Sequence, residues 1–463
     1  MTTASPDADF RAPDQPAVNA YRGRFKIEIV ARYAEVIAIF GMLLIFFGFF
    51  WTPLAYFGRG NEDLQDSDPF AQAANVLLLV FLLAGGLARR KEMWRALTLG
   101  WPILLVVGIA FASALWSEDP ELVVRRAGVL MLSTLFGFYI FSSVGLPSLC
   151  RVLVVAFVVI AVGSFAIVAV SPGRGLGAVA GEVNAWRGAF LQKNTLGYVA
   201  GLGVIVSGYA FINRYGSRAL SAAALVLTAP LTVLSASKTA LLFLFAAIYI
   251  GLFCAVLRRR SARGVAAAYV LIVVAVLAIG YSILDPSIVL AAFKRDTTLS
   301  GRVDLWVDVI DAIQLRPWLG YGYGAFWRSD AFAANQIWAT VGWDPPQAHN
   351  GWLELGLNLG LLGIFAVGLL WIVFAVRLMR LLVVPAATDI VLCGIIFTVN
   401  FAQNLSEADL LRQSDTVWLF FVIAFLHLKS QLQHHASSPR LSSPLPQRRV
   451  IERFRAGTDA VRL

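Results

Sequence analysis

The sequence predicts an all-α membrane protein that crosses the bilayer about twelve times. Hydrophobic residues fill 59% of the 463 positions and charged residues only 14%, whereas soluble domains are about one quarter charged. The apolar residues also collect in runs of about 20, the length that a helix needs to cross a hydrocarbon core of about 30 Å. One long polar stretch, residues 284–348, interrupts these runs in the second half of the chain.

The apolar runs divide the chain into three parts. Residues 1–33 are polar, rich in Pro and Asp, and contain no apolar core of the kind that a cleavable signal peptide has. The transmembrane domain covers residues 34–428, and a basic tail that is predicted to be disordered covers residues 429–463. The predicted spans begin near Ala34, Asn75, Thr98, Ala127, Val152, Thr195, Ala219, Thr239, Val265, Asn350, Val383 and Asp415.

Basic residues predict which face of the membrane each loop occupies. Lys and Arg resist translocation, so loops that are rich in them face the cytoplasm. The segment before the first span, the loops after every second span and the tail are basic, as at Arg89, Arg90 and Arg258. Both termini are therefore predicted to be cytoplasmic. The net charge of +10 follows from this bias and from attraction to anionic lipid; it forms no stripe typical of nucleic-acid binding.

The loops on the outer face hold nearly all of the unusual polar sequence, so the functional site is predicted there. No ATP pool exists outside a bacterial inner membrane, and a synthetic reaction on this face must use a substrate that was activated before it crossed. The outer loops are residues 61–68, 116–126, 173–194, 235–238, 284–348 and 404–412.

The pattern of Cys and His does not support a metal site or a disulfide. Cys150, Cys254 and Cys393 lie in or beside spans near the cytoplasmic side, without a CxxC pair. Of the four histidines, only His349 is on the outer face, and one imidazole cannot build a His-based metal site. The acidic run at residues 61–68 fits a solvated loop better than a cation site. We expect neither a metal nor another cofactor.

An amphipathic helix is predicted inside the long outer loop. Ser300 is a candidate N-cap, and the run ends at Arg316 and Pro317. Arg302 falls in the first turn, where a cation opposes the helix dipole but can join free backbone N–H groups in binding a phosphate. A surface arginine without a ligand is the alternative. The apolar residues at helical spacing are Leu305, Trp306, Val309, Ile310 and Ile313.

Aromatic residues and one histidine follow this helix. The Gly-Tyr-Gly-Tyr-Gly segment at residues 320–324 lacks the spacing of a phosphate or dinucleotide motif, and it is predicted to be a tight turn beside a flat substrate. His349 precedes a span, with Glu354 one turn in, where a general base that works near neutral pH could act; a structural histidine is the alternative. Aromatic faces suit sugars, although an aromatic belt at the lipid interface is the competing explanation. The aromatic residues are Trp306, Trp318, Tyr321, Tyr323, Trp327 and Trp343.

A set of short motifs between residues 113 and 412 resembles one known superfamily. The motifs are SALWSEDP from Ser113, WRGAF from Trp186, KNTLG from Lys193, SASKT from Ser235, GR from Gly301 followed by Trp306, PWLGYGYG from Pro317, HNG from His349 followed by Glu354, and NLSE from Asn404. Together they resemble the O-antigen ligase and O-antigen polymerase superfamily (Wzy/WaaL-like), and most closely the exopolysaccharide polymerases of the ExoQ type. Gln192 stands where relatives often have His, which puts a mechanism with a histidine pair in doubt.

The resemblance implies a multi-pass glycosyltransferase of the bacterial inner membrane with a periplasmic active site. Such an enzyme polymerises undecaprenyl-diphosphate-linked repeat units into exopolysaccharide or O-antigen, without a metal and with inversion at the anomeric carbon. A ligase that transfers lipid-linked glycan to lipid A core or another acceptor is the first alternative. A polysaccharide or small-molecule transporter is the second, although the centres of the spans carry almost no ionisable residues. The implied partners are the lipid-linked donor, a glycan or lipid-linked acceptor, membrane lipid and a chain-length-determining copolymerase.

The resemblance also implies roles for individual residues. Arg187 and Arg302 would neutralise the charge that develops on the diphosphate leaving group. His349 would activate or orient the acceptor hydroxyl. The residues implied in substrate binding are Lys193, Asn194, Trp306, Tyr321, Tyr323, Trp327, Asn350, Glu354 and Glu407.

Overall fold

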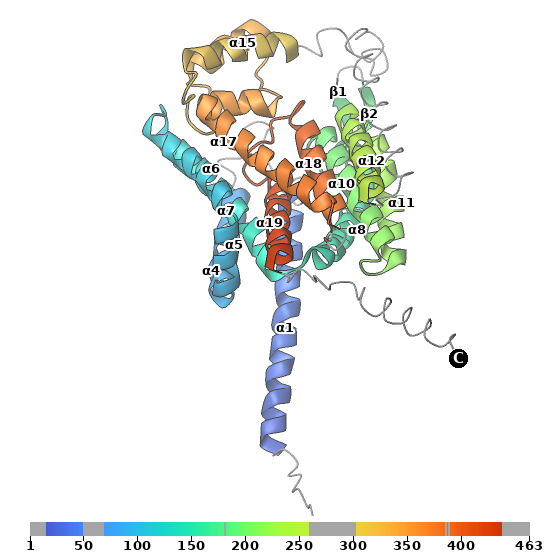
Figure 1. The fold of residues 1–463 in the computed structure, drawn as a ribbon. Helices are drawn as coiled ribbons and strands as arrows, with labels where there is room; N and C mark the ends of the chain where they lie inside the picture. The colour runs from blue at the N-terminus through green and yellow to red at the C-terminus, as the bar shows by residue number, and fades with distance from the viewer. Residues whose placement is uncertain are drawn as a thin grey trace, which may run out of the picture.

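The computed structural model describes residues 15–49, 69–179, 182–258, 302–384, 387 and 389–437. In these ranges the chain forms a bundle of helices (Figure 1). The long helix α1 (Gln15–Phe46) projects from one end of the bundle, and α15 (Arg302–Leu315) lies at the opposite end. The span predicted from Ala34 is therefore the second part of a longer helix that begins before residue 34.

Seven of the described helices are long and apolar enough to cross a membrane, which confirms the prediction of a helical membrane protein. A pair of helices that bends by 79° would make an eighth span: α5 (Arg90–Leu99) and α6 (Trp101–Ala112), which runs into η1 (Ser113–Leu115). The apolar helices α11 (Arg218–Leu234) and α18 (Ile390–Gln403) are shorter. The seven are α4 (Pro69–Ala88), α7 (Pro120–Ser143), α8 (Leu146–Val170), α10 (Lys193–Asn213), α12 (Lys238–Arg258), α17 (Gly351–Leu382) and α19 (Thr416–Ser437).

The predicted count of twelve spans stays a prediction, because the span expected from Val265 lies outside the described residues. The expected disordered tail is also only partly described. Helix α19 continues to Ser437, past the predicted boundary at residue 428, so the first residues of that segment are helical and not disordered.

Small residues let the helices of the bundle approach one another closely. Lipid tails are as apolar as Leu, so helices in a membrane associate through tight packing more than through the hydrophobic effect. In α10, a Cβ at Gly201 would lie 2.7 Å from the ring of Phe243 in α12, and a Cβ at Gly203 would lie 2.7 Å from Thr228 in α11. These glycines fix α10 against both neighbours, and α10 begins at the end of the bundle that holds α15 (Figure 1).

The strands form one short antiparallel hairpin that the sequence did not predict. The hairpin consists of β1 (Leu176–Val179) and β2 (Glu182–Trp186), and it follows the short helix α9 (Pro172–Gly175). It lies at the same end of the bundle as α15 (Figure 1). The all-α prediction is therefore correct for the membrane helices but misses this hairpin.

Helix α17 is broken within its first half, and the Gly-rich turn fills the break. Gly360 has φ 59° and ψ −156°, a region that only glycine occupies readily. A break of this kind leaves backbone groups without helical partners, and these must be satisfied by other protein groups. The backbone N–H of Tyr321 donates to the carbonyl of Leu357 at 2.8 Å, and that of Gly322 donates to Asn358 at 3.0 Å. The turn therefore completes the hydrogen bonding of the broken helix.

The alternating glycines are needed for this close approach. A Cβ at Gly320 would lie 2.5 Å from the carbonyl oxygen of Leu357, and a Cβ at Gly360 would lie 2.5 Å from the carbonyl carbon of Trp318. Both contacts are with backbone atoms, which cannot move aside as a flexible side chain does. The predicted tight turn at residues 320–324 is confirmed, and its partner is a second segment of the chain.

We expect Gly360→Ala to destabilise the protein by about 1–3 kcal/mol, because the side chain would force a glycine conformation and collide with the turn. Thermal unfolding of the purified variant, followed by tryptophan fluorescence, measures the effect. Gly368→Ala is the matched control, since no atom lies within 4 Å of a Cβ placed there in the same helix. Equal stability of the two variants would contradict this description of the break.

The predicted amphipathic helix is confirmed as α15, which packs on α17 together with α16 (Phe332–Val341). Leu305, Val309 and Ala312 are buried, whereas Ile310 is 43% exposed although it was expected on the apolar face. Residues 305, 309 and 312 are spaced by four and three positions and share one side of a helix, and residue 310 points about 100° away from 309. The candidate N-cap Ser300 lies outside the described residues.

Candidate functional site

Motifs that are far apart in the sequence lie side by side at the α15 end of the bundle. The indole N–H of Trp116 donates to the carbonyl of Leu319 at 2.9 Å. The N–H of Gly351 donates to the carbonyl of Asn404 at 2.9 Å. The WSEDP, GYGYG, HNG and NLSE motifs therefore form one assembly, as expected for loops that share a face of the membrane.

The WSEDP loop and the start of α7 contact the Gly-rich turn at residues 320–324. A Cβ at Gly322 would lie 2.5 Å from the side chain of Ser117, so the two loops are in close contact. The guanidinium of Arg126 donates to the carbonyl of Gly324. Because the turn also fills the break in α17, the WSEDP loop and α17 hold it from two sides.

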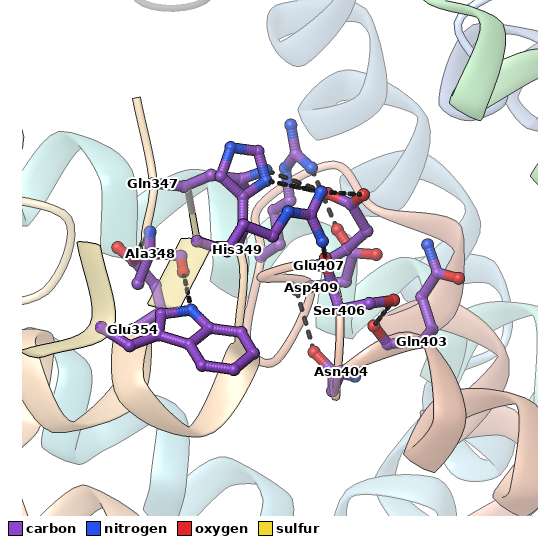
Figure 2. A network of polar contacts seen from close by, with 12 residues as sticks. Gln347, Ala348, His349, Glu354, Gln403, Asn404, Ser406, Glu407 and Asp409 are labelled. Carbon is purple, nitrogen blue, oxygen red and sulfur yellow. Dashed lines mark hydrogen bonds and ion pairs between the residues drawn. The ribbon is translucent and has the colours of Figure 1, made fainter. Parts of the chain in front are cut away.

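Arg302, His349 and Glu407 meet at the centre of this assembly (Figure 2 labels the last two). Nη1 of Arg302 donates to the carbonyl of Ser406 at 2.6 Å, and Nη2 lies 3.4 Å from Oε1 of Glu407. Nδ1 of His349 lies 3.4 Å from Oε2 of Glu407 and 3.5 Å from Nη2 of Arg302. Gln347 also reaches this carboxylate, at 3.2 Å. Two of the three residues predicted to be catalytic, Arg302 and His349, are thus brought together by Glu407.

The local sequence around His349 explains how it is held. His349 has φ 50°, a left-handed conformation that turns the chain sharply before α17. Asn350 is the N-cap of this helix, and its side-chain oxygen accepts from the N–H groups of Trp352 at 3.0 Å and Leu353 at 3.2 Å. A Cβ at Gly351 would lie 2.2 Å from Oδ1 of Asn404. The HNG sequence therefore provides the histidine, the cap and the close approach to the loop that carries Glu407.

Glu354 and two tryptophans hold the backbone next to His349. The carboxylate of Glu354 accepts from the N–H of Ala348 at 2.8 Å and from the indole N–H of Trp327 at 3.0 Å. The indole N–H of Trp306 donates to the carbonyl of Ala348 at 2.9 Å. These contacts give Trp306, Trp327 and Glu354 a positioning role. Their predicted contacts with substrate stay predictions.

The tyrosines of the Gly-rich turn also have structural partners. The hydroxyl of Tyr323 donates to the carbonyl of Leu411, and the side chain is only 5% exposed. The hydroxyl of Tyr321 donates to the carbonyl of Ala312 at 2.9 Å, and the guanidinium of Arg316 lies over its ring. The turn is thus anchored to α15 and to the loop after α18, and stacking of these rings on a sugar remains untested.

The loop that carries Glu407 is organised by a buried asparagine. Asn404 is fully buried; its Oδ1 accepts from the N–H of Asp409 at 2.9 Å, and its Nδ2 donates to the carbonyl of Asn400 at 2.8 Å. Asp409 in turn forms an ion pair with Arg412 at 3.0 Å. These bonds fix the path of the chain on both sides of Glu407, so the carboxylate is directed at His349.

Electrostatics keep Glu407 ionised. Burial acts to raise its pKa, but the hydrogen bond with His349 and the positive charge of Arg302 outweigh burial and hold the pKa below the ordinary value of 4.5. A carboxylate with a lowered pKa stabilises the folded protein fully above its ordinary pKa. That stabilisation is lost as the pH falls through the pKa of the folded state.

We therefore expect the melting temperature of the protein to fall below about pH 4.5, and to fall less steeply in Glu407→Gln, which has no charge to lose at this position. Melting temperatures of both proteins between pH 3 and pH 7 measure the difference. Glu121→Gln is the control, because Glu121 is exposed on α7. The same slope in Glu407→Gln and wild type would show that the pair with Arg302 and His349 does not form.

Arg187 lies at the same end of the bundle but is not joined to this cluster. It follows β2, and its Nη2 donates to the carbonyl of Leu176 at 3.0 Å. Its Nε is buried without a hydrogen-bond partner in the described part of the chain. No polar contact links Arg187 to Arg302 or His349 among these residues. Lys193 and Asn194, also predicted to bind substrate, begin α10.

The sequence analysis missed two residues of the site. Gln347 contacts both His349 and Glu407, and Asn358 donates to Glu354 at 3.4 Å and accepts from the N–H of Gly324 at 2.9 Å. Gln347 could have been found by its position two residues before His349. Asn358 is a polar residue within an apolar span, which is itself a signal of a role.

The sequence also predicted that the cysteines lie apart from the site and that the chain has no metal site. All three cysteines are buried and free. Among the described residues, no three His, Cys, Asp or Glu side chains are grouped so that they could hold a metal ion. The expectation that the enzyme needs no metal stays a prediction.

Two comparisons with known proteins agree with the motifs. Residues 223–368, which include Arg302 and His349, match the family model described as O-Antigen ligase. The chain is also 30% identical over 192 residues to the "Exopolysaccharide production protein ExoQ" of Rhizobium meliloti (strain 1021), a match that covers 38% of this chain and 43% of that protein. The match thus spans less than half the length of this curated relative. Both similarities agree with the resemblance to the O-antigen ligase and polymerase superfamily that the motifs predicted.

Proposed function

We propose that this chain is a glycosyltransferase of the inner membrane that polymerises undecaprenyl-diphosphate-linked repeat units into exopolysaccharide. The observation that carries the proposal is the meeting of Arg302, His349 and Glu407, from three separate segments, at one end of a membrane helix bundle. The similarity to ExoQ supports polymerisation. In this proposal both termini are cytoplasmic, and residues 284–348 form the catalytic loop on the periplasmic face.

His349 would act as the general base. In this role Nδ1 of His349 would donate its hydrogen to the ionised carboxylate of Glu407, which only accepts hydrogen bonds, and the lone pair of Nε2 would be free. Nε2 would take the proton of the acceptor hydroxyl as the acceptor oxygen bonds to the anomeric carbon of the donor. The bond from this carbon to the diphosphate oxygen breaks, and its electron pair leaves with undecaprenyl diphosphate. A single displacement of this kind inverts the anomeric configuration.

Arg302 would bind the leaving group. The guanidinium carries five N–H donors, and its contacts with Ser406 and Glu407 leave others for phosphate oxygens. Glu407 balances the charge of Arg302, so the cluster alone offers no net positive charge to a diphosphate. Further cations are therefore required, and Arg187, with its buried and unsatisfied Nε, and Lys193 are the candidates.

An O-antigen ligase is the second candidate, because the matching family model carries that description. The same cluster would then transfer a finished glycan from the lipid diphosphate to lipid A core or another acceptor. A polymerase would act with a chain-length-determining copolymerase, whereas a ligase would have no need of one.

Deletion of the gene discriminates between these functions. A polymerase predicts loss of long polysaccharide while single lipid-linked repeat units persist, and complementation with wild type but not with His349→Ala restores the polymer. Intact polymer that fails to become attached to its acceptor would instead identify a ligase. Lipid-linked polymer that accumulates on the cytoplasmic side would contradict both and support a transporter. Electrophoresis of polysaccharide and mass spectrometry of the lipid-linked fraction provide the readout.

A further inference from the structure

A polar pocket opens between α15 and α16, next to the catalytic cluster. Its volume of about 390 Å³ lies in the range of sites that bind small molecules. Polar and apolar groups both contribute to its wall, which distinguishes it from the apolar interfaces between the membrane helices. The lining residues are Asp304, Val307, Asp308, Thr340, Val341 and Trp343.

Trp343 connects the pocket to His349. The centres of the indole and imidazole rings are 6.0 Å apart, with 33° between their planes. Trp343 is 40% exposed, whereas the indole N–H groups of Trp306 and Trp327 are bonded to the carbonyl of Ala348 and to the carboxylate of Glu354. The exposed indole offers a flat apolar surface, and its distance from His349, the proposed base, is about the width of one sugar ring.

Asp308 supplies an unsatisfied acceptor in the same wall. Its Oδ2 is buried without a hydrogen-bond partner in the described part of the chain. Burial, followed by the charges of Asp311 and Asp304, raises the pKa of Asp308. The rest of the side chain is only half-buried and lines the pocket, so a ligand that donates hydrogen bonds can reach this carboxylate. Sugar hydroxyls are such donors, while a uronic acid would be repelled by Asp304 and Asp308.

We propose that this pocket binds an uncharged sugar of the acceptor glycan, with Trp343 stacked on the C–H face of the ring and Asp308 accepting from its hydroxyls. This inference rests on the proposed function, because it places the acceptor so that the next hydroxyl reaches His349. The pocket would then determine which sugar can be extended. The pocket would take no part in the transfer step, which the proposal assigns to Arg302, His349 and Glu407.

Binding can be measured without transfer. The probe is a set of neutral oligosaccharides obtained by partial hydrolysis of the exopolysaccharide of the producing cell, titrated by calorimetry against the full-length protein in nanodiscs. We expect Asp308→Ala and Trp343→Ala to weaken binding at least about tenfold, the loss that removal of a hydrogen bond to a charged group produces. Gln314→Ala, an exposed residue of α15 that does not line the pocket, and Trp318→Ala, whose side chain is 72% exposed, are the matched controls and should bind as wild type does. A control variant that weakens binding as much as the pocket variants would overturn the proposal.

The melting temperature of an Asp308 variant shows whether Asp308 binds the ligand or supports the fold. Asp308→Asn removes a negative charge that Asp311 and Asp304 repel, so its melting temperature should equal or exceed that of wild type while its affinity falls. A parallel loss of stability and affinity would mean that Asp308 supports the fold and would overturn the proposal. If wild type transfers glycan but every variant binds the oligosaccharides normally, the subsite is wrong and the polymerase stands. If wild type binds them through Trp343 and Asp308 but transfers nothing, the subsite stands and the catalytic proposal fails.

Discussion

Arg302→Ala is expected to lower the rate of glycan transfer by about 10²–10³, the loss typical of removing a group that stabilises developing charge. Arg302 begins α15 and reaches Ser406 and Glu407 in a different segment, so its side chain also ties α15 to the loop after α18. Initial rates of elongation, measured with purified protein in nanodiscs, provide the test.

Arg302→Lys separates charge from geometry. A lysine keeps the charge but cannot contact two groups with a planar fork, so we expect it to recover only a small part of the lost rate. Arg125→Ala is the control, because Arg125 is exposed on α7. Full activity in Arg302→Lys would show that positive charge alone is needed, and full activity in Arg302→Ala would remove Arg302 from the site.

His349→Asn is expected to lower the rate of transfer by about 10²–10⁴, as removal of a general base does. Asparagine is the informative replacement, because His349 has φ 50° and Asn adopts this conformation more readily than most residues. His349→Ala would add backbone strain to the loss of the imidazole. Rates at saturating and low donor concentration show whether kcat or KM carries the loss.

Rescue by added imidazole distinguishes a His349 that acts as a general base from a His349 that only positions the acceptor. If His349 takes the proton, added imidazole should restore part of the activity of His349→Gly, in which glycine accepts the left-handed backbone. If His349 only orients the acceptor, imidazole should have no effect. His434→Asn, in the last helix, should match wild type in both assays. Wild-type rates in His349→Asn would contradict the proposed base.

Local patterns predicted those features that depend on nearby residues. The amphipathic helix α15 followed from the spacing of its apolar residues, and the tight turn at residues 320–324 followed from its glycines. The meeting of the WSEDP, GYGYG, HNG and NLSE motifs agrees with the distribution of Lys and Arg, which predicted that these loops share one face of the membrane. None of these inferences required knowledge of which helices are neighbours.

Contacts between distant segments could not be predicted in the same way. Gly360 looks like any small residue in an apolar span, and only the structure shows that it breaks α17 and that the Gly-rich turn fills the break. Glu407 was expected to contact substrate, and its contact with His349 depends on how the loop after α18 packs against α17. The aromatic residues near the site were expected to face sugar, yet the indole N–H of Trp306 donates to the carbonyl of Ala348 and that of Trp327 donates to the carboxylate of Glu354.

The most direct test of the account is elongation of an authentic undecaprenyl-diphosphate-linked repeat unit by purified protein in nanodiscs with EDTA present. The account predicts longer lipid-linked glycan at the same rate with and without EDTA, and almost none with Arg302→Ala or His349→Asn. Elongation that proceeds equally well in these variants, or a wild-type protein that cannot elongate its own repeat unit, would contradict catalysis by the cluster of Arg302, His349 and Glu407.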